Sequence, residues 1–373
     1  DFEFPDFDEG TRATTFYTTG TTGEPKAVAY SHRQLVLHTM GLLAGLGPIE
    51  TSNRLHGGDV YMPITPMFHV HAWGFPYAAT LLGIKQVYAG RYTPANLLRL
   101  IAEEGATFSH CVPTILQMLL SAPEAADTDL SRLKMLIGGS ALPRGLAESA
   151  LAQGINVYTG YGLSETCPVL TFAVLDPDDE ADVEARLKTG NPLPLVDLQT
   201  VGAGMAELPR DGASTGEVVV RAPWLNAEYV KNPEATEALW EGDYLHTGDV
   251  GHIDASGALM ITDRMKDVIK SGGEWVSSLE LESLVSAVDG VAEVAAIGVQ
   301  DDKWGERPVL LIVAREGAEE DAIKGGISAA AQQAVAAGNL SKWAVPDQFR
   351  FVAEIAKTSV GKIDKKRLRA EFE

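Results

Sequence analysis

The chain has 373 residues, of which 45% are hydrophobic and 22% are charged, and its formal net charge is -21. This length and balance predict a soluble, globular chain of two or three domains. The acidic charge argues against nucleic acids and anionic membrane surfaces as partners, and no apolar run approaches the roughly 18 residues of a membrane-spanning helix.

The first half of the chain alternates strand-like and helix-like patterns. Extended segments are expected at residues 14–17, 60–66, 85–89, 108–112, 134–137 and 156–158. Helices are expected at residues 31–46, 74–82, 94–104 and 113–121. Such alternation predicts an α/β fold in which a parallel sheet is flanked by helices.

The pattern changes in the second half. From about residue 189 the chain consists of short runs punctuated by Gly and Pro, which suit a small antiparallel β subdomain. Beyond Asp263, helices at 277–288 and 321–337 and extended segments at 291–299, 308–313 and 348–352 predict an α+β domain. We therefore divide the chain into a large domain at 1–265, with an α/β part at 13–188 and a β-rich part at 189–265, and a smaller C-terminal domain at 266–373.

One run near the N-terminus has the composition of a phosphate-binding loop, FYTTGTTGEPKA at 16–27. Its glycines let backbone N–H groups approach an anion, its threonines add donors, and its lysine adds a mobile positive charge. The predicted phosphate ligands are Thr18, Thr19, Gly20, Thr21, Thr22, Gly23 and Lys26. The same composition also suits a flexible surface turn.

Two runs in the middle of the chain combine glycines with a carboxylate. In YTGYGLSET at 158–166, Glu165 could hold Mg²⁺, although a strand-to-helix turn with a Ser/Glu cap explains the run equally simply. In YLHTGDV at 244–250, Asp249 could accept both hydroxyls of a ribose. An ordinary turn containing Asp is the alternative there.

Two later runs are basic. In TDRMKDVIKSGGEW at 262–275, Arg264 could reach a sugar or a phosphate, and Lys266 lies where a swivel between domains would be; a solvated charged turn is the alternative. In KTSVGKIDKKRLR at 357–369, the last four cations suit an exposed helix face. Lys362 differs, because it follows a glycine on a loop and can reach away from its own domain.

The N-terminal segment and the cysteines bear on the compartment. The first residues, DFEFPDFDE, lack the basic and apolar stretches of a signal peptide. Cys111 and Cys167 do not have the spacing of a disulfide framework or a metal site. We therefore expect a cytoplasmic protein without stable membrane insertion.

In this order, the five runs resemble those of the adenylate-forming superfamily of acyl-CoA synthetases, peptide-synthetase adenylation domains and beetle luciferases. Three further runs look like the medium- and long-chain fatty acyl-CoA synthetase branch, namely FHVHAWGFPYAAT at 68–80, IKSGGEWVSS at 269–278 and KWGERP at 303–308. The resemblance covers nearly the whole chain. It departs from the family at Ala27, where glycine is usual, and in the lobe that normally precedes the phosphate loop, so we expect a fragment or a chain that works with a separate lobe.

The resemblance implies a reaction in two steps. A carboxylic acid and Mg·ATP would give an acyl-adenylate and pyrophosphate, and CoA would then displace AMP. Lys362 would align the acid with the α-phosphate, while Lys26 and the threonines would hold the other phosphates and Glu165 the metal. Adenine would be framed by Gly139, Ser140, Gly160, Tyr161 and Gly162, and ribose would be held by Asp249 and Arg264.

The resemblance also implies that the C-terminal domain is mobile and rotates about Lys266 after adenylation, which withdraws Lys362. His69 and Trp73 are four residues apart, so on a helical turn they share a face. Core packing would explain both residues, whereas the resemblance puts His69 beside the carboxylate or CoA and makes Trp73 a gate to the acyl tunnel. Relatives in this branch also suggest a homodimer.

Two alternatives stay open. Within the same chemistry, the chain could be a ligase for a short or sulfur-containing acid such as 3-methylmercaptopropionate, because such ligases resemble this branch around His69 and Trp73. From a different class, it could be a nucleotide-binding remnant without activity.

Overall fold

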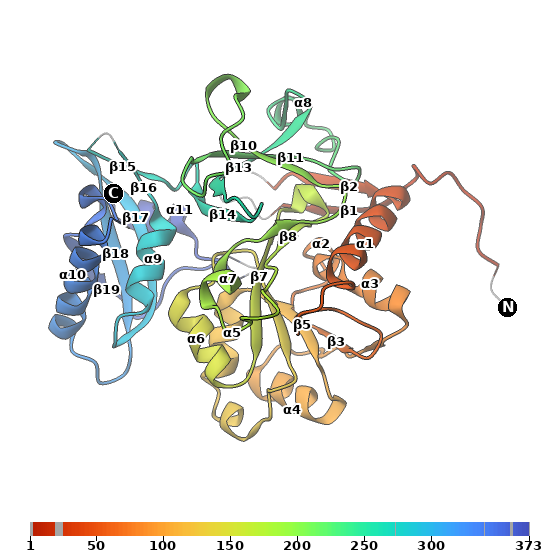
Figure 1. Cartoon of the computed structure of the whole chain (residues 1–373), viewed down its shortest axis with the longest axis horizontal. Coiled ribbons are helices and arrows are strands. Elements are labelled where there is room, and N and C mark those ends of the chain that lie inside the picture. The colour runs from red at the N-terminus through yellow and green to blue at the C-terminus, as the bar shows by residue number, and fades with distance from the viewer. Residues whose placement is uncertain (1–2, 19–24, 273, 339, 359–360, 373) are drawn as a thin grey trace.

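A seven-stranded sheet forms the centre of the large domain (Figure 1). The computed structural model describes residues 3–18, 25–272, 274–338, 340–358 and 361–372. The sheet has the order β4-β3-β5-β6-β7-β8-β9; β4 to β7 are parallel, and β8 and β9 are antiparallel to their neighbours. The strands are β3 (Val60–Pro63), β4 (Lys85–Gln86), β5 (Phe108–Cys111), β6 (Lys134–Ile137), β7 (Asn156–Gly162), β8 (Val169–Phe172) and β9 (Asn191–Pro192). The predicted parallel sheet is confirmed.

Apolar side chains on both faces of this sheet require cover on both sides. In β6, Leu136 belongs to one core cluster, whereas Met135 and Ile137 belong to the other, as the alternation of a strand demands. The first cluster is covered by α1 (His32–Leu46) and α3 (Phe75–Leu82). The second is covered by α4 (Pro94–Glu104), α5 (Pro113–Leu120) and α6 (Arg144–Ala152). Two short helices complete this part, α2 (Val70–Trp73) and α7 (Val183–Leu187).

Local sequence signals explain where these helices begin. Ser31 and Gln34 form a reciprocal capping box at the start of α1. Proline opens α4 and α5, where a missing N–H costs no helical hydrogen bond.

The β-rich part of the large domain is antiparallel, as expected. Its sheet has the order β10-β11-β13-β12, and β14 also pairs with β13. The elements are β10 (Asp197–Val201), β11 (Gly216–Arg221), α8 (Pro233–Glu237), β12 (Trp240–Glu241), β13 (Tyr244–Ile253) and β14 (Leu259–Arg264). A separate antiparallel hairpin of β1 (Arg12–Tyr17) and β2 (Ala27–Ser31) lies near the N-terminus.

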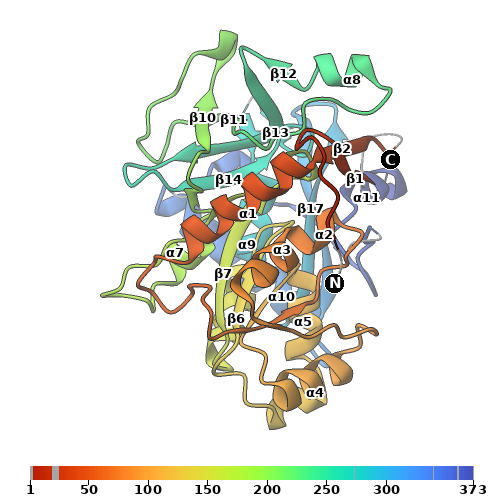
Figure 2. The same cartoon turned by 90° about the vertical axis from the view of Figure 1, so that its right-hand side faces the viewer.

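The C-terminal residues form a second body at the left of Figure 1, with its own core. Its sheet has the order β16-β15-β18-β17, with β19 parallel to β18. The elements are β15 (Ile269–Ser271), β16 (Glu274–Val276), α9 (Ser278–Ser286), β17 (Val291–Asp301), β18 (Gly305–Ala314), α10 (Glu320–Ala336), β19 (Gln348–Phe351) and α11 (Lys365–Phe372). The chain passes between the two bodies after Arg264, and the view in Figure 2 shows α11 beyond the β1–β2 hairpin.

Four 3₁₀ segments connect the elements, η1 (Pro123–Asp127), η2 (Ser164–Thr166), η3 (Ala203–Met205) and η4 (Lys342–Ala344). Two strands are shorter than predicted. β3 ends at Pro63, although the sequence predicted that it would extend to residue 66. Pro63 and Pro66 both lack the backbone N–H that a strand donates to its neighbour, so the segment between them does not continue the sheet. β4 covers only Lys85–Gln86, although the backbone N–H of Val87 still donates to Tyr61. Over the described ranges, no helix combines the length and apolar character needed to cross a membrane.

Candidate active site

A cavity of about 520 Å³ lies at the carboxyl ends of β6 and β7. Ligands of open α/β sheets commonly bind at this edge. Residues of β13 and of the C-terminal body complete its walls. The predicted site residues on its lining are Thr18, Lys26, His69, Trp73, Gly139, Gly160, Tyr161, Gly162, Glu165, Asp249, Arg264, Lys266 and Lys362. Residues from both bodies therefore meet on one cavity.

The other predicted residues fall elsewhere. Ser140 lines a neighbouring cavity of about 670 Å³, which shares Tyr161, Asp249 and Lys362 with the first. Thr19, Gly20, Thr21, Thr22 and Gly23 lie outside the described residues.

The two ends of the phosphate-loop run are held together. The backbone N–H of Thr18 donates to the carbonyl of Lys26 at 2.9 Å, and the N–H of Lys26 donates to Thr18 Oγ1 at 3.1 Å. The ammonium of Lys26 lies 4.7 Å from the centre of the Tyr229 ring, a cation–π distance. The run is thus anchored at its base, with Lys26 facing the cavity.

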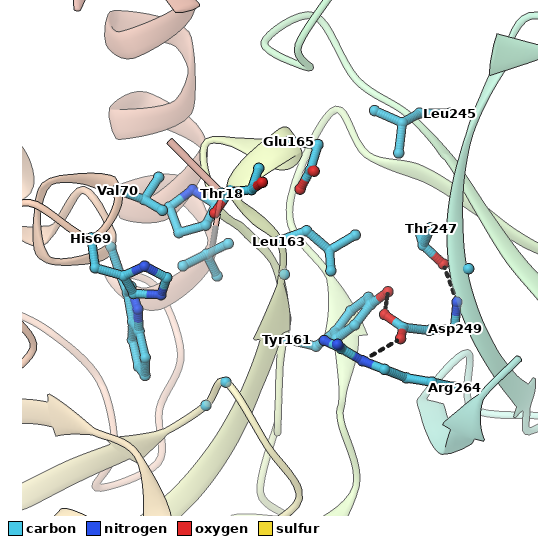
Figure 3. A pocket seen from close by; sticks show the side chains of 18 of the residues that line it. Thr18, His69, Val70, Tyr161, Leu163, Glu165, Leu245, Thr247, Asp249 and Arg264 are labelled. Carbon is cyan, nitrogen blue, oxygen red and sulfur yellow. Dashed lines mark hydrogen bonds and ion pairs between the residues drawn. The ribbon is translucent and has the colours of Figure 1, made fainter. Parts of the chain in front are cut away.

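A buried carboxylate, Asp249, organises the wall opposite His69 and Val70 (Figure 3). The hydroxyl of Tyr161 donates to Asp249 Oδ2 at 2.7 Å, and Arg264 Nε lies 3.3 Å from Oδ1. The backbone N–H of Asp249 donates to Thr247 Oγ1 at 3.1 Å. Burial raises the pKa of Asp249, while the charge of Arg264 and the Tyr161 hydrogen bond act in the opposite direction. Two partners therefore hold the carboxylate, and a third holds the backbone of the same residue.

Glu165 lies on η2 and lines the cavity near Thr18 (Figure 3). The hydroxyl of Tyr229 donates to Glu165 Oε1 at 2.6 Å, and the backbone N–H of Asn226 donates to the Glu165 carbonyl at 2.8 Å. Among the described residues, no group of three or more His, Cys, Asp and Glu side chains is arranged to hold a metal ion. One carboxylate nevertheless suits Mg²⁺ bound mainly through substrate phosphates, because Mg²⁺ commonly takes one or two carboxylates and keeps several waters.

Lys362 reaches this cavity from the segment just before α11. The N–H of Thr358 donates to the Lys362 carbonyl at 2.7 Å, and Thr114 Oγ1 of the large domain donates to the Gly361 carbonyl at 2.8 Å. A Cβ on Gly139 would lie 3.0 Å from Lys362 Cε, so the glycine leaves room for the lysine stem.

The pKa of Lys362 is lowered to about 8, first because the surrounding protein removes water from the ammonium and second because Arg264 repels it. Asp249 and Glu165 attract the ammonium and act in the opposite direction. The pKa of His69 is lowered to about 4 by burial and by the charge of Lys362. At neutral pH the cavity therefore holds a charged lysine and a neutral histidine.

The wall beneath His69 is a left-handed turn, which the sequence did not predict. Val70, His71, Ala72 and Trp73 have φ angles of 48°, 51°, 49° and 60°. Each such residue costs roughly 1–2 kcal/mol relative to right-handed backbone, because Cβ crowds the following carbonyl. The turn is left-handed rather than right-handed, and both His69 and Trp73 line the cavity.

Trp73 closes this end of the cavity. Its ring stacks on the buried ring of His110 with centroids 4.9 Å apart, and only 6% of the residue is exposed. A Cβ on Gly138 would come within 3.1 Å of the indole. Tight packing on both sides therefore fixes the indole.

Sequence reasoning missed several cavity residues, notably Tyr229, Thr247 and Thr358. Tyr229 lies in an irregular segment and meets Glu165 from 64 residues away. Only the fold brings them together. Thr247 directly precedes the Gly-Asp pair of β13, so the run that pointed to Asp249 could have indicated it.

Comparisons with known proteins agree with this geometry. The family model described as AMP-binding enzyme matches residues 3–230, and the model described as AMP-binding enzyme C-terminal domain matches residues 280–362. The chain is 40% identical over 370 residues to a long-chain-fatty-acid–CoA ligase of Thermus thermophilus, covering 95% of this chain and 65% of that protein. It is 37% identical over 380 residues to a 3-methylmercaptopropionyl-CoA ligase of Ruegeria lacuscaerulensis, covering 100% of this chain and 68% of that protein.

The fold is also similar to the solved structure of ATP-bound MatB from Rhodopseudomonas palustris. The TM-score is 0.83 at 26% identity, with coverage of 100% of this chain and 70% of that one. The chain thus spans about two thirds of the length of these relatives, with 65% and 68% of the two ligases covered.

Proposed function

The chain belongs to the AMP-binding enzyme family, and from this premise we propose that it carries the activity of an AMP-forming acyl-CoA ligase. A carboxylate oxygen attacks the α-phosphorus of ATP, the bond to the bridging oxygen breaks, and pyrophosphate leaves with that electron pair. The sulfur of CoA then attacks the acyl carbon, and AMP leaves with the electrons of the mixed-anhydride bond. Adenylation is needed because a carboxylate has no leaving group of its own.

One observation carries the proposal. Lys362 of the C-terminal body projects into the cavity that the large domain lines with Tyr161, Asp249 and Arg264. Negative charge accumulates around the α-phosphate as the acid attacks, and a fixed cation at that point lowers the barrier. With a pKa of about 8, Lys362 is charged at neutral pH and suits this role.

The large domain would bind the nucleotide. Asp249 and Arg264 face the ribose, and Gly139, Gly160 and Gly162 give the adenine close access to backbone. Thr18 and Lys26, with the rest of the loop between them, hold the outer phosphates. Tyr161 forms a wall beside the base and keeps its hydroxyl on Asp249. Ser140, on the neighbouring cavity, is assigned to the same adenine frame.

Mg²⁺, when bound, would neutralise charge on the outer phosphates and orient them. Glu165 is the residue that we assign to it, and Tyr229 holds that carboxylate toward the cavity through its hydroxyl.

The acid would enter between His69 and Trp73. His69 stays neutral near pH 7, so it can accept or donate a hydrogen bond without repelling the substrate carboxylate. We propose a fatty acid as the substrate. A short, sulfur-containing acid is the second candidate, because the two ligases that the chain resembles are named for a long-chain fatty acid and for 3-methylmercaptopropionate.

The second half-reaction would follow a rotation of the C-terminal domain, residues 266–373, about Lys266. Rotation breaks the contact between Thr114 and Gly361 and withdraws Lys362, which opens the cavity for CoA. A cytoplasmic location and a homodimeric assembly are further parts of the proposal; cell fractionation and light scattering test them.

Acid-dependent exchange of radiolabelled pyrophosphate into ATP tests the activity. A panel of acids from propionate and 3-methylmercaptopropionate to palmitate, each assayed also for CoA-dependent AMP release, identifies the substrate class. A nucleotide-binding remnant would bind ATP without exchanging label, and that result would overturn the proposed function.

A further inference from the structure

The left-handed turn of α2 has few bonds of its own to hold it. The backbone N–H of Gly74 donates to the His71 carbonyl at 3.2 Å. The four residues before Gly74, from Val70 to Trp73, are not glycines and all have positive φ angles. Such backbone persists only where its surroundings fix it. Trp73 faces the cavity from this turn, so whatever fixes the turn also fixes the end of the pocket.

We propose that His71 is a positioning residue that holds the left-handed turn against Thr14, so that Trp73 ends the acyl pocket at a defined depth. The assignment of the pocket to an acyl chain rests on the proposed function. The anchoring of the turn rests on the contacts of His71 alone.

Three side chains surround the imidazole. His71 Nε2 lies 2.9 Å from Thr14 Oγ1, within hydrogen-bond distance. The ring meets Phe16 edge-on at 5.5 Å between centroids and Tyr77 at 5.7 Å, with interplanar angles of 90° and 78°. Burial lowers the pKa of His71, which favours the neutral ring. A neutral ring keeps one N–H donor and one acceptor, so it can pair with a hydroxyl in either direction.

The partner of His71 lies on the strand that enters the phosphate-loop run. Thr14 is in β1, and four residues later Thr18 closes the base of that run against Lys26. The hydrogen bond therefore links the turn that carries Trp73 to the strand that carries the predicted phosphate loop.

A second brace lies on the inner side of the turn. Trp73 stacks on His110, and the His110 ring is itself held by Thr65 at 2.9 Å and Tyr61 at 2.7 Å. The indole is therefore fixed directly by its stack on His110, and the turn that carries it is held by His71. Loss of the outer anchor lets the turn relax toward allowed backbone, which moves the indole away from Gly138 and deepens the pocket.

The test compares four variants with the wild-type chain. His71→Ala removes the anchor, His71→Gln keeps an amide near the position of Nε2, and Thr14→Val removes the partner hydroxyl while keeping its shape. His56→Ala is the matched control, because this histidine also has a local polar contact but does not line the cavity.

The first readout does not depend on activity. Fluorine NMR of fluorotryptophan-labelled protein reports on Trp73, whose resonance is identified by its loss in Trp73→Phe. We expect His71→Ala and Thr14→Val to shift or broaden this resonance, and His71→Gln and His56→Ala to keep it. The double variant, His71→Ala with Thr14→Val, should shift the resonance no further than either single variant, because both substitutions remove the same hydrogen bond.

The second readout is acid selectivity in pyrophosphate exchange. His71→Ala should reduce the discrimination between the preferred acid and longer acids by about tenfold, the scale of a small change in an apolar pocket, mainly through KM. An unchanged Trp73 resonance in both His71→Ala and Thr14→Val would overturn the proposal, whatever their thermal stability. If the wild-type chain shows no exchange, the proposed function fails, and the resonance comparison still decides the role of His71.

Discussion

The two sides of the cavity are held in different ways. On the large-domain side, Asp249 is fixed by Tyr161, Arg264 and Thr247. On the other side, Lys362 belongs to the C-terminal body, and the neighbouring Gly361 accepts a hydrogen bond from Thr114 of the large domain. Interlinked groups within one domain are already arranged for their ligand, whereas a lysine carried by a separate domain can be delivered and removed with that domain. The difference suggests a static nucleotide side and a movable catalytic side.

A second contact between the two bodies lies close to the chain crossing. Asp263, just before the predicted pivot Lys266, accepts hydrogen bonds from the backbone N–H and hydroxyl of Ser278 at 2.6 and 2.8 Å. Lys365 donates to the same hydroxyl at 2.6 Å and pairs with Glu282 at 2.7 Å. These groups are buried close to the chain crossing. The bonds from Ser278 to Asp263 thus join the two bodies close to the predicted pivot, where a rotation could leave them in place.

The largest expected effect is on the movable side. Lys362→Ala removes the cation that faces the developing charge, so the rate of acyl-adenylate formation should fall by about 10²–10³-fold. Single-turnover pyrophosphate release measures it. Lys357→Ala is the matched control, because this nearby lysine is exposed and lines neither cavity. A similar loss in both variants would mean that general electrostatics, rather than the position of Lys362, supports the reaction.

The next effect is on the static side. Asp249→Asn removes the charge that pairs with Arg264 and a strong acceptor for the ribose, so ATP affinity should fall by about 10- to 100-fold, the scale of a hydrogen bond to a charged group. Calorimetric titration with ATP measures it without turnover. Asp211→Asn, at an exposed turn, is the control. If ATP binding stays unchanged while turnover falls, Asp249 acts on the chemical step and the static side is misassigned.

Trp73 belongs to the large-domain side as well, but we assign it to the acid rather than to the nucleotide. Trp73→Ala should loosen chain-length selectivity by about tenfold in kcat/KM ratios across an acid series. It should also destabilise the fold by about 3–5 kcal/mol, because it leaves a cavity against His110. If the variant is less stable but keeps the same selectivity among acids, Trp73 serves only to pack the core.

The pH profile gives the smallest effect. Since the pKa of Lys362 is lowered to about 8, the ammonium is charged below that pH and neutral above it. Adenylation should therefore fall by about threefold between about pH 7.5 and about pH 8.5. His69, with a pKa of about 4, stays neutral across this range and adds nothing. Lys362→Arg should remove this fall in rate, because a guanidinium group stays charged over the same pH range. A wild-type rate that does not change with pH would contradict the role of Lys362 as the charged catalytic group.

Much of the fold followed from local signals. The alternation of β5, α5 and β6 predicted a parallel sheet, and Pro94 and Pro113 marked helix starts. The short motifs also pointed to residues that the fold brings onto one cavity, such as Tyr161, Asp249 and Lys362, while their chemical roles stay predictions. The success has a physical reason, since these motifs combine glycine, hydroxyl and charge in ways that packing alone rarely requires.

Other features had no local signal. The turn at Val70–Trp73 contains no glycine, and side-chain-bearing residues rarely adopt positive φ, so a right-handed turn was the natural expectation. Its conformation is set by His110 on one side and by Thr14 on the other, both distant in sequence. The bond from Tyr229 to Glu165 likewise depends on where an irregular segment folds back. Tertiary contacts, rather than propensity, decide both.

The central claim is that Lys362 serves the first half-reaction and is then withdrawn. The most direct measurement supplies Lys362→Ala with preformed acyl-adenylate and CoA and follows thioester formation. The rate should stay close to that of the wild-type chain, alongside the loss of adenylation. An equal loss in both half-reactions would contradict the assignment of Lys362 to the first step alone.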